Sequence, residues 1–308
     1  MMAITRDRDS SVSASWRGKR LFRYVYRPGE PPYESPRPYF HPVRTLRGHL
    51  VSLYRPHDHV WHKGIAWSLC EVGGMNFWGG PTYRRDRGYL QLDNNGRMRH
   101  DGFEAVTVRG EALTIDERLT WITPQDEAWI SEQRLITASV RPDQAAWRLS
   151  FATRMRNVSG SDIPIGSPTT EGRPDAGYSG LFWRGPRSFS GGTVLTQDGP
   201  AGEELMGSRG PWLGFVGQHD GSGRSSTLLF ADNPANFCFP TEWFVRTSIY
   251  GCVCPAPFFS EVYDLADGET LTLRYDVFIA DGALTAGDCA ALVADLPQAS
   301  TAAGVAVG

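Results

Sequence analysis

The sequence predicts an all-β fold, a large antiparallel β-sandwich that ends in one short C-terminal helix. Three observations lead to this class. Several segments alternate apolar and polar side chains with the period of two that half-buried strands show. The 308 residues include 34 Gly and 21 Pro, and 12% are aromatic, which suits many turns between ring-rich strands. Only one segment has helical spacing, so strand segments greatly outnumber helices.

The clearest strands lie in residues 145–157 and 269–280. In the first segment Trp147, Leu149 and Phe151 fall on one face, while arginine and serine side chains alternate onto the other. The second segment repeats this pattern with leucine, tyrosine, valine and isoleucine. We therefore expect each strand to bury one face.

Residues 111–123 and 127–140 look like two neighbouring strands, because both are rich in β-forming residues and the turn around residues 124–126 separates them. Shorter runs of the same kind are also strand candidates. They lie at residues 21–26, 49–54, 88–93, 226–231 and 258–265.

The predicted organisation has three parts. Residues 1–18 are polar and lack periodicity, so they are interpreted as a disordered tail. Residues 19–283 are predicted to form a single β-sandwich domain, because no change of composition divides them. Residues 284–308 are predicted to be a C-terminal helix and tail, with Thr285 capping the start of the helix.

Composition and charge argue against a nucleic-acid partner and against a membrane protein, and we expect a small-molecule substrate. The net charge is −3 and the 31 basic residues are scattered, which argues against a nucleic-acid partner. No apolar run reaches the length of a membrane span and no secretory signal is visible, so we expect a cytoplasmic protein. The five cysteines lack CxxC spacing, which indicates reduced thiols. An oligomer is compatible with these features.

A cluster of histidines is the strongest functional signal. His57, His59 and His62 fall within six residues, with Asp58 and Trp61 among them. Neutral imidazole is both a natural acid or base near neutral pH and the commonest side-chain metal ligand. We therefore interpret this segment as part of a functional site, with acid–base chemistry and metal ligation both open.

Three further segments hold candidate site residues. Trp78 lies in NFWGG, where aromatic rings beside a flexible turn suit stacking on a sugar ring. Glu171 lies in TTEG within a long loop, and a buried loop carboxylate can act as a general base. Arg246 lies on an apolar segment, where a guanidinium needs an anionic or hydroxyl-rich partner.

These segments in this order resemble the family described as "methane oxygenase PmoA-like", whose function is unknown. The resemblance runs from about Arg37 to Gly282. It rests on PHDHVWHKG, then NFWGG, TTEG, DNPANFCFPTEWFVR and GETLTLRYDVFIADG. In the commoner family pattern consecutive histidines stand where this chain has Trp61-His62, and a histidine stands where it has Asn233. The resemblance therefore points to His59 and His62 as the stable positions.

The resemblance implies a setting in carbohydrate catabolism, because members of that family tend to be encoded near sugar oxidoreductases and sugar isomerases. It does not imply methane oxidation, since the membrane-bound methane oxygenases span the membrane many times. The architecture is also similar to the galactose-mutarotase-like supersandwich. In that fold a concave sheet holds a sugar among histidine, carboxylate and arginine side chains.

The leading hypothesis is a carbohydrate-active enzyme of the epimerase, lyase or hydrolase type. It assigns His59, His62 and Glu171 to acid–base catalysis, and it expects them to converge with Arg246 on one pocket. Three alternatives remain open: a divalent metal on the histidines that polarises a keto-sugar, a carbohydrate-binding protein without catalysis, and a scaffold whose polar loops are merely solvated. In the leading hypothesis, substrate binding falls to His57, Trp61, Trp78 and Arg246, and a metal site would use His57, His59 and His62.

Overall fold

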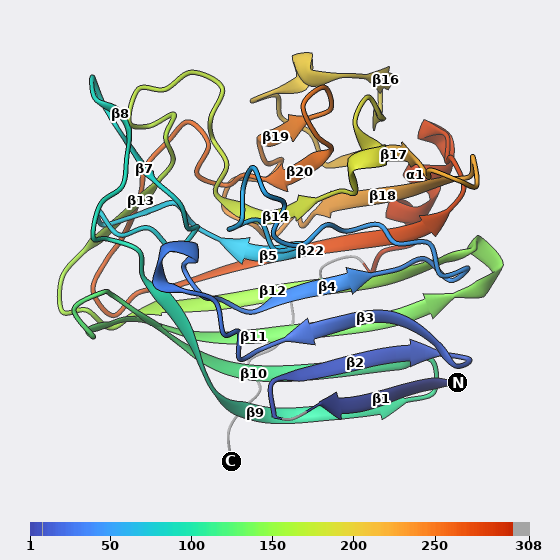
Figure 1. Ribbon diagram of the computed structural model, residues 1–308, viewed down its shortest axis with the longest axis horizontal. Helices are drawn as coiled ribbons and strands as arrows, with labels where there is room; N and C mark the ends of the chain where they lie inside the picture. The colour runs from blue at the N-terminus through green and yellow to red at the C-terminus, as the bar shows by residue number, and fades with distance from the viewer. Residues whose placement is uncertain (8, 298–308) are drawn as a thin grey trace.

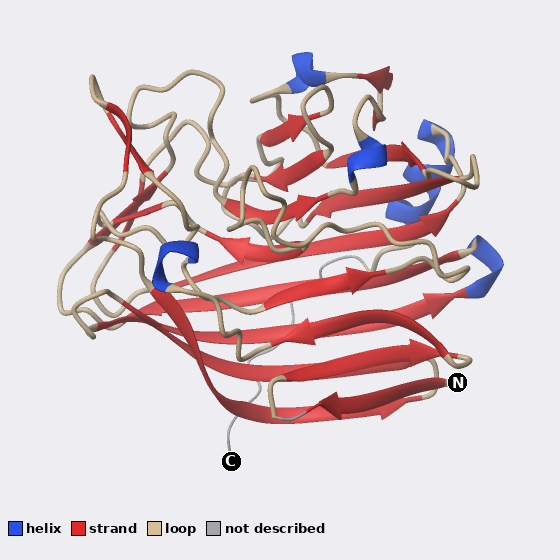
Figure 2. Ribbon diagram, in the orientation of Figure 1, coloured by secondary structure: helices blue, strands red, loops and turns tan. Residues whose placement is uncertain are grey.

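Two large antiparallel sheets pack face to face in the computed structural model, which describes residues 1–7 and 9–297 (Figure 1). The strands run through the whole molecule, and helices are few and short (Figure 2). The prediction of an all-β antiparallel sandwich with a C-terminal helix is confirmed.

The first sheet has eight strands, and all pairings within it are antiparallel. In spatial order they are β1 (Met2–Asp7), β2 (Ser11–Trp16), β3 (Lys19–Val25), β4 (Tyr39–Val43), β5 (Ile65–Ser68), β14 (Gly180–Arg184), β20 (Cys252–Pro255) and β19 (Trp243–Arg246).

The second sheet has nine strands and is also antiparallel. In spatial order they are β16 (Gly199–Ala201), β15 (Thr193–Thr196), β17 (Trp212–Gln218), β18 (Ser225–Asp232), β22 (Thr270–Asp281), β12 (Ala146–Asn157), β11 (Ala128–Arg141), β10 (Ala112–Ile122) and β9 (Arg97–Arg109).

Short elements connect and cover these sheets. One small sheet pairs three strands and another pairs two. They are β6 (Glu71–Val72), β13 (Ile163–Gly166) and β21 (Tyr263–Leu265), then β7 (Thr82–Arg84) and β8 (Gly88–Leu90), with 3-10 turns η1 (Pro32–Glu34), η2 (Pro142–Gln144), η3 (Arg187–Phe189) and η4 (Glu203–Leu205).

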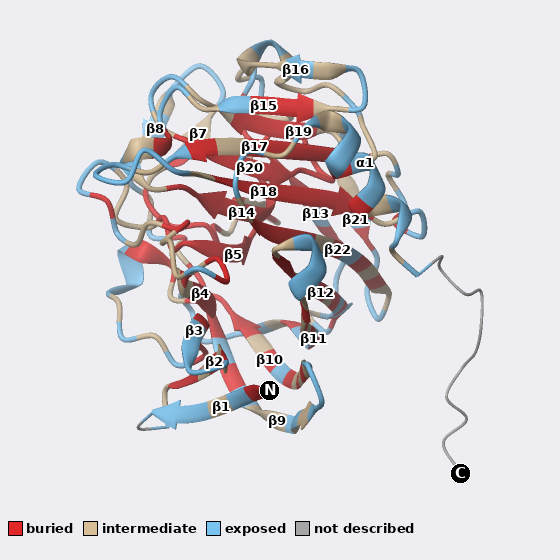
Figure 3. Cartoon of the chain, turned by 90° about the vertical axis from the view of Figure 1, so that its right-hand side faces the viewer, coloured by how far each residue is buried: buried red, intermediate tan, exposed pale blue. Residues whose placement is uncertain are grey.

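Aromatic side chains from both sheets meet in the core. Trp67 of β5 stacks on Phe151 of β12 with ring centroids 6.0 Å apart, and Phe22 of β3 stacks on Trp147 of β12 at 5.6 Å. All four side chains are buried. Burying one such ring contributes up to about 3 kcal/mol, so these contacts hold the two layers together. Figure 3 shows buried residues along the strands and exposed residues mainly in turns and edge strands.

The long strands lie where alternation predicts them. β12 and β22 pair with each other and each buries its apolar face, as expected. β10 and β11 form the predicted hairpin. The prediction of a strand at 49–54 is wrong, because this segment makes only isolated bridges through Leu50 and Tyr54.

The prediction of a disordered N-terminal tail at residues 1–18 is wrong. Residues of this segment form β1 and β2, which pair with each other, and β2 pairs with β3. Val12, Ala14 and Trp16 are buried, and the amino group of Met1 lies 3.2 Å from Glu111. The sandwich therefore begins before residue 19, because small apolar residues alternating with serine are sufficient to pack β2.

The C-terminal helix is confirmed as α1 (Ala286–Ala294). The side chain of Thr285 accepts a hydrogen bond from the backbone N–H of Asp288, and the Asp288 side chain accepts one from the backbone N–H of Thr285. Cys289 and Leu292 of α1 are buried against the second sheet beside Trp212. Residues 298–308 of the predicted tail lie outside the described residues. Among the described helices, none has the length and apolar character needed to cross a membrane.

Candidate active site

The histidine segment folds into two consecutive turns that bring His59 and His62 together. A bridge between Tyr54 and Lys63 closes the loop. Inside it, the N–H of His59 donates to Pro56 O across 3.0 Å and the N–H of His62 donates to His59 O across 2.9 Å. The rings of His59 and His62 consequently stack, with centroids 4.6 Å apart and planes 18° from parallel.

Buried charges hold this loop in place. Glu34 is 1% exposed and binds both Arg55, across 2.6 Å, and Lys63. Arg37 is also buried and donates to the carbonyl of Trp61 across 2.7 Å. These pairs fix the loop on both sides of the histidines. The stacked rings therefore rest on a rigid base.

Asp58 sets the proton position on His59. The Oδ2 atom of Asp58 accepts a hydrogen bond from Nδ1 of His59 across 2.9 Å. The same carboxylate accepts from Arg184 across 3.1 Å and from Arg187 across 2.7 Å. Burial disfavours its charge, but the hydrogen bonds from His59, Arg187 and Arg184 outweigh burial and hold the pKa of Asp58 far below its usual range. An ionised carboxylate accepts only, so Nδ1 of His59 carries a proton, and in the neutral form of the ring the lone pair is on Nε2.

Arg184 sets the opposite arrangement on His62. Its Nη1 lies 3.0 Å from Nδ1 of His62, and a guanidinium only donates, so Nδ1 must be the acceptor. The proton of the neutral ring is therefore on Nε2. Burial, together with the charges of His59 and Arg184, lowers the pKa of His62 well below its usual value. His62 is thus a neutral hydrogen-bond donor beside a ring that offers a lone pair.

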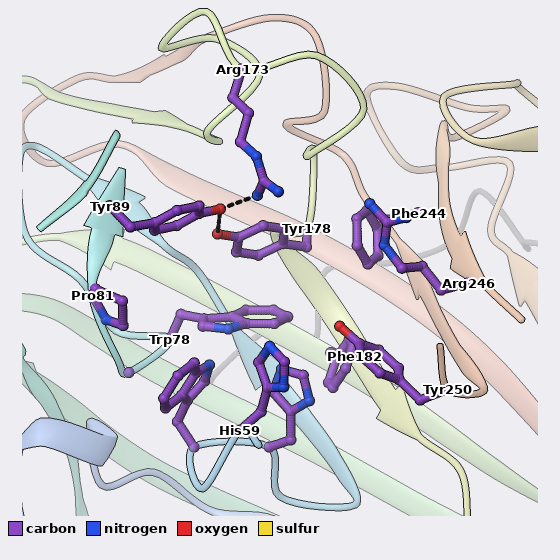
Figure 4. Close-up of a pocket in the computed structure, with 13 residues that line it drawn as sticks. His59, Trp78, Pro81, Tyr89, Arg173, Tyr178, Phe182, Phe244, Arg246 and Tyr250 are labelled. Atoms are coloured by element: carbon purple, nitrogen blue, oxygen red, sulfur yellow. Dashed lines mark hydrogen bonds between the residues drawn. The ribbon is translucent and has the colours of Figure 1, made fainter. Parts of the chain in front are cut away.

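These rings lie at the base of a pocket of about 360 Å³, a size typical of small-molecule sites (Figure 4). Most of its wall is aromatic. The lining residues are His59, Trp61, His62, Trp78, Gly79, Pro81, Tyr89, Arg173, Tyr178, Phe182, Phe244, Arg246 and Tyr250.

The strands of the first sheet and the loops beside them position these residues. Phe182 comes from β14, and Phe244 and Arg246 come from β19. Trp61 packs against Gly80, where an added Cβ would meet its ring at 2.7 Å, so the two loops interlock only because Gly80 has no side chain.

A tyrosine pair forms the wall opposite the histidines (Figure 4). The hydroxyl groups of Tyr89 and Tyr178 are 2.6 Å apart, and Arg173 donates to the Tyr89 hydroxyl. Burial raises the pKa of Tyr178 well above its ordinary value, and burial also raises that of Tyr89. Tyr250, whose ring lies under the Arg184 guanidinium at 3.6 Å, has a pKa raised by burial as well. All three phenols therefore stay protonated at neutral pH.

The pocket contains five of the residues that sequence analysis selected. They are His59, His62, Trp61, Trp78 and Arg246. Glu171 is not among the lining residues. It borders a separate crevice of about 10 Å³ that shares Trp78, Pro81 and Tyr178 with the pocket. In the turn at 167–172 its backbone N–H donates to Ser167 O across 3.2 Å.

His57 also lies outside the pocket. It is exposed, and its Nδ1 accepts from Arg187 across 3.0 Å. The stacked geometry of His59 and His62, the guanidinium on His62 and the position of His57 do not fit a shared divalent ion. Within residues 1–7 and 9–297, no group of three or more His, Cys, Asp or Glu side chains is arranged to hold a metal.

Sequence reasoning missed several residues of the site. Asp58 was noted among the histidines but received no role. Arg184 carried a usable signal, because it ends an otherwise apolar strand and a fully buried charge needs a partner. Tyr89, Tyr178 and Tyr250 gave no local signal, since aromatic residues are common throughout the chain.

Solved structures with similar folds include galactose 1-epimerase from Lactobacillus acidophilus NCFM, at 9% identity and a TM-score of 0.42. That match covers 92% of this chain and 99% of the other. A GH36 α-galactosidase from Geobacillus stearothermophilus has 13% identity and a TM-score of 0.39, over 92% of this chain and 41% of the other. An α-galactosidase from Lactobacillus brevis has 10% identity and a TM-score of 0.36, over 91% and 39%. The chain thus spans about two fifths of the length of these α-galactosidases.

No curated protein matches the chain. Residues 11–294 match a family whose description, "Family of unknown function (DUF6807)", does not mention methane oxygenases. The motifs were therefore right in pointing to a family without known function, but the match does not show the methane oxygenase PmoA-like description. The matched range covers nearly the whole chain, and the protein belongs to the DUF6807 family.

Proposed function

We propose that this protein is a carbohydrate-active enzyme in which His59 transfers a proton and His62 donates a hydrogen bond to a substrate oxygen. One observation carries the proposal: two stacked imidazoles share the Asp58–Arg184 pair and hold their protons in opposite arrangements. One ring offers a lone pair and its neighbour offers an N–H. A hydroxyl group and an oxygen acceptor on neighbouring sugar atoms have the complementary pattern.

The chemistry follows from this pairing. Epimerisation, ring opening and elimination on a sugar all remove a proton from one atom while negative charge develops on an oxygen. His59 can accept that proton on Nε2, and the Asp58 carboxylate stabilises the imidazolium that forms. His62 stays neutral and stabilises the developing charge through its N–H. A positioned acid–base group of this kind contributes about 10²–10⁴-fold to rate.

The walls support a sugar as the ligand. Trp61 lies beside His59, with ring centroids 5.2 Å apart, and Trp78 lies beside His62, at 5.9 Å. Both line the pocket, and tyrosine hydroxyls lie opposite the histidines. Aromatic faces stack on the apolar faces of sugar rings, while protonated phenols and guanidinium groups bind their hydroxyl groups. In this proposal Asp58, rather than Glu171, is the carboxylate that serves the reaction.

Proton exchange in D₂O tests the proposal directly. A panel of aldoses, ketoses and glycosides is incubated with the protein, and deuterium incorporation or product formation is followed by NMR. We expect turnover of at least one sugar, and a loss of about 100-fold or more in His59→Gln. His49→Gln is the matched control, because His49 stacks on His219 away from the pocket. Full turnover by His59→Gln would overturn the assignment.

The aromatic lining also favours a second candidate, a carbohydrate-binding protein without catalysis. The same experiment separates the two functions. If a sugar binds but neither incorporates deuterium at carbon nor changes its configuration, the result supports the binding protein. No observation favours the metal-dependent alternative.

A further inference from the structure

The charges around the pocket extend the proposed function to a substrate class. Two of the lining residues, Arg173 and Arg246, carry guanidinium groups, and none of the lining residues is an aspartate or glutamate. Both arginines lie on the side of the pocket away from the loop of His59 (Figure 4). A neutral sugar does not require such an arrangement.

Arg246 is the stronger of the two observations. Its side chain is only 25% exposed, yet it donates no hydrogen bond to any residue in 1–7 or 9–297. Its nearest carboxylate, Glu203, lies 3.8 Å away, beyond hydrogen-bond distance. The other oxygen of Glu203 is taken by the backbone N–H of Thr247 across 2.6 Å. The donors of this guanidinium are therefore not used by the protein and are available to a ligand in the pocket.

The strand geometry directs these donors into the pocket. Arg246 and Phe244 are two residues apart on β19, so their side chains leave the same face, and both line the pocket. Arg173 reaches the same space from the loop above β14. It makes no ion pair within the described part of the chain, and its guanidinium lies 4.8 Å from the centre of the Tyr89 ring.

We infer that the sugar bound in this pocket carries a carboxylate, as in a uronic or aldonic acid, and that Arg246 and Arg173 bind that group. The inference rests on the proposed function. A guanidinium matches the two oxygens of a carboxylate with a pair of parallel hydrogen bonds. The low polarity of the aromatic wall strengthens this contact, and the two cations face no opposing acid among the lining residues.

Calorimetric titration compares matched ligands. The probes are D-glucuronate and D-galacturonate, their uncharged methyl esters, and D-glucose 6-phosphate. We expect a free acid to bind about tenfold or more tightly than its ester, because hydrogen bonds to charged groups are worth more than those between neutral groups. Arg246→Gln should reduce that preference to about twofold or less, and Arg173→Gln should weaken it. Arg154→Gln, which removes an exposed charge on β12, should leave it unchanged.

Each of the other outcomes contradicts either the carboxylate site alone or the proposed function as well. Equal affinity for acid and ester, or a preference that survives both pocket variants, overturns the carboxylate site. Tighter binding of the phosphate than of either acid reassigns the anion and also overturns it. If neutral sugars bind as well as acids while His59→Gln abolishes proton exchange, only this inference fails. If no sugar binds, the proposed function fails with it.

Discussion

One guanidinium, that of Arg184, contacts both Nδ1 of His62 and the carboxylate of Asp58, at 3.0 and 3.1 Å. Asp58 in turn accepts from His59, so Arg184 determines the proton position of His62 directly and also binds the carboxylate that determines the proton position of His59. Nε2 of neutral His59 is therefore a hydrogen-bond acceptor, whereas Nε2 of His62 is a donor. This polarity is a property of the free protein and does not depend on a ligand.

Nitrogen-15 NMR of the imidazoles should find His62 neutral, with its proton on Nε2, from pH 8 down to pH 6.5, where an ordinary histidine is half protonated. Its pKa is lowered by burial and by the nearby positive charges, so acidification through this range should not protonate it. In Arg184→Gln the side-chain amide can donate or accept, and both tautomers should become populated. A His62 that gains a proton above pH 6.5 in the unaltered protein would contradict this account.

Two carboxylate variants should behave differently. Asp58→Asn removes the charge that stabilises a protonated His59, and kcat on an identified substrate should fall by about 10²–10⁴-fold. Glu171→Gln should change kcat by less than about threefold, because Glu171 lies outside the pocket. The reverse ranking would return Glu171 to the role of base and would show that Asp58 does not support proton transfer by His59.

Gly80→Ala should weaken both folding and ligand binding. The new Cβ would lie 2.7 Å from the Trp61 ring at a φ of +70°, so either the ring or the turn must move. We expect a loss of about 1–3 kcal/mol in the free energy of unfolding, measured with urea. Gly88→Ala is the control, because Gly88 has a φ of +72° and nothing within 4 Å of an added Cβ. Equal losses in both variants would mean that backbone strain, and not the contact with Trp61, is responsible.

Acid should destabilise the protein partly through His41. Burial, with the charge of Arg44, lowers the pKa of His41 to about 4, whereas an unfolded histidine titrates near 6.5. Between these values the unfolded chain binds the proton and the folded chain does not, so the free energy of unfolding falls as pH falls. The slope from this group approaches about 1.4 kcal/mol per pH unit. Urea unfolding of His41→Gln between pH 4 and 6.5 should show a correspondingly smaller slope than the parent protein, and an unchanged slope would remove His41 as the cause.

Removal of residues 2–17 should lower stability by several kcal/mol, because it takes the buried side chains of Val12 and Trp16 out of the core and exposes the edge of β3. Amide hydrogen exchange on the full chain provides an independent check. The β2 amides that bond to β3 should exchange slowly. An unchanged urea midpoint after truncation, or fast exchange along β2, would show that the β1–β2 hairpin contributes little to the stability of the fold.

The long strands were predictable because a single property, the alternation of apolar and polar side chains over about twelve residues, is sufficient to identify them. β2 had the same signal in SVSASW, where Val12, Ala14 and Trp16 alternate with serine. The signal was weak because serine and alanine differ little in polarity, and only pairing with β3 turns it into a buried strand. Segment 49–54 shows the reverse case, since an apolar run that meets no partner strand along its length stays irregular.

For the candidate site, the local sequence was sufficient to predict that His59 and His62 lie together, because they are three positions apart in one loop. It was insufficient for Glu171 and Arg184, whose positions depend on contacts with distant segments. The position of Glu171 depends on the path of a long loop, and the sequence of that loop does not determine its path. Arg184 lies 122 positions from the histidine that it contacts.

The residues that line the pocket come from distant parts of the chain, and this has a consequence for folding. The lining begins at His59 and ends at Tyr250, and neither the histidine loop nor β19 makes a cavity without the other. Contacts between such distant segments require the closure of long loops, which is slow and occurs after local hairpins such as β10–β11 have formed. The pocket should therefore be among the last regions to assemble, and recovery of ligand binding during refolding should lag behind recovery of the far-ultraviolet circular dichroism signal.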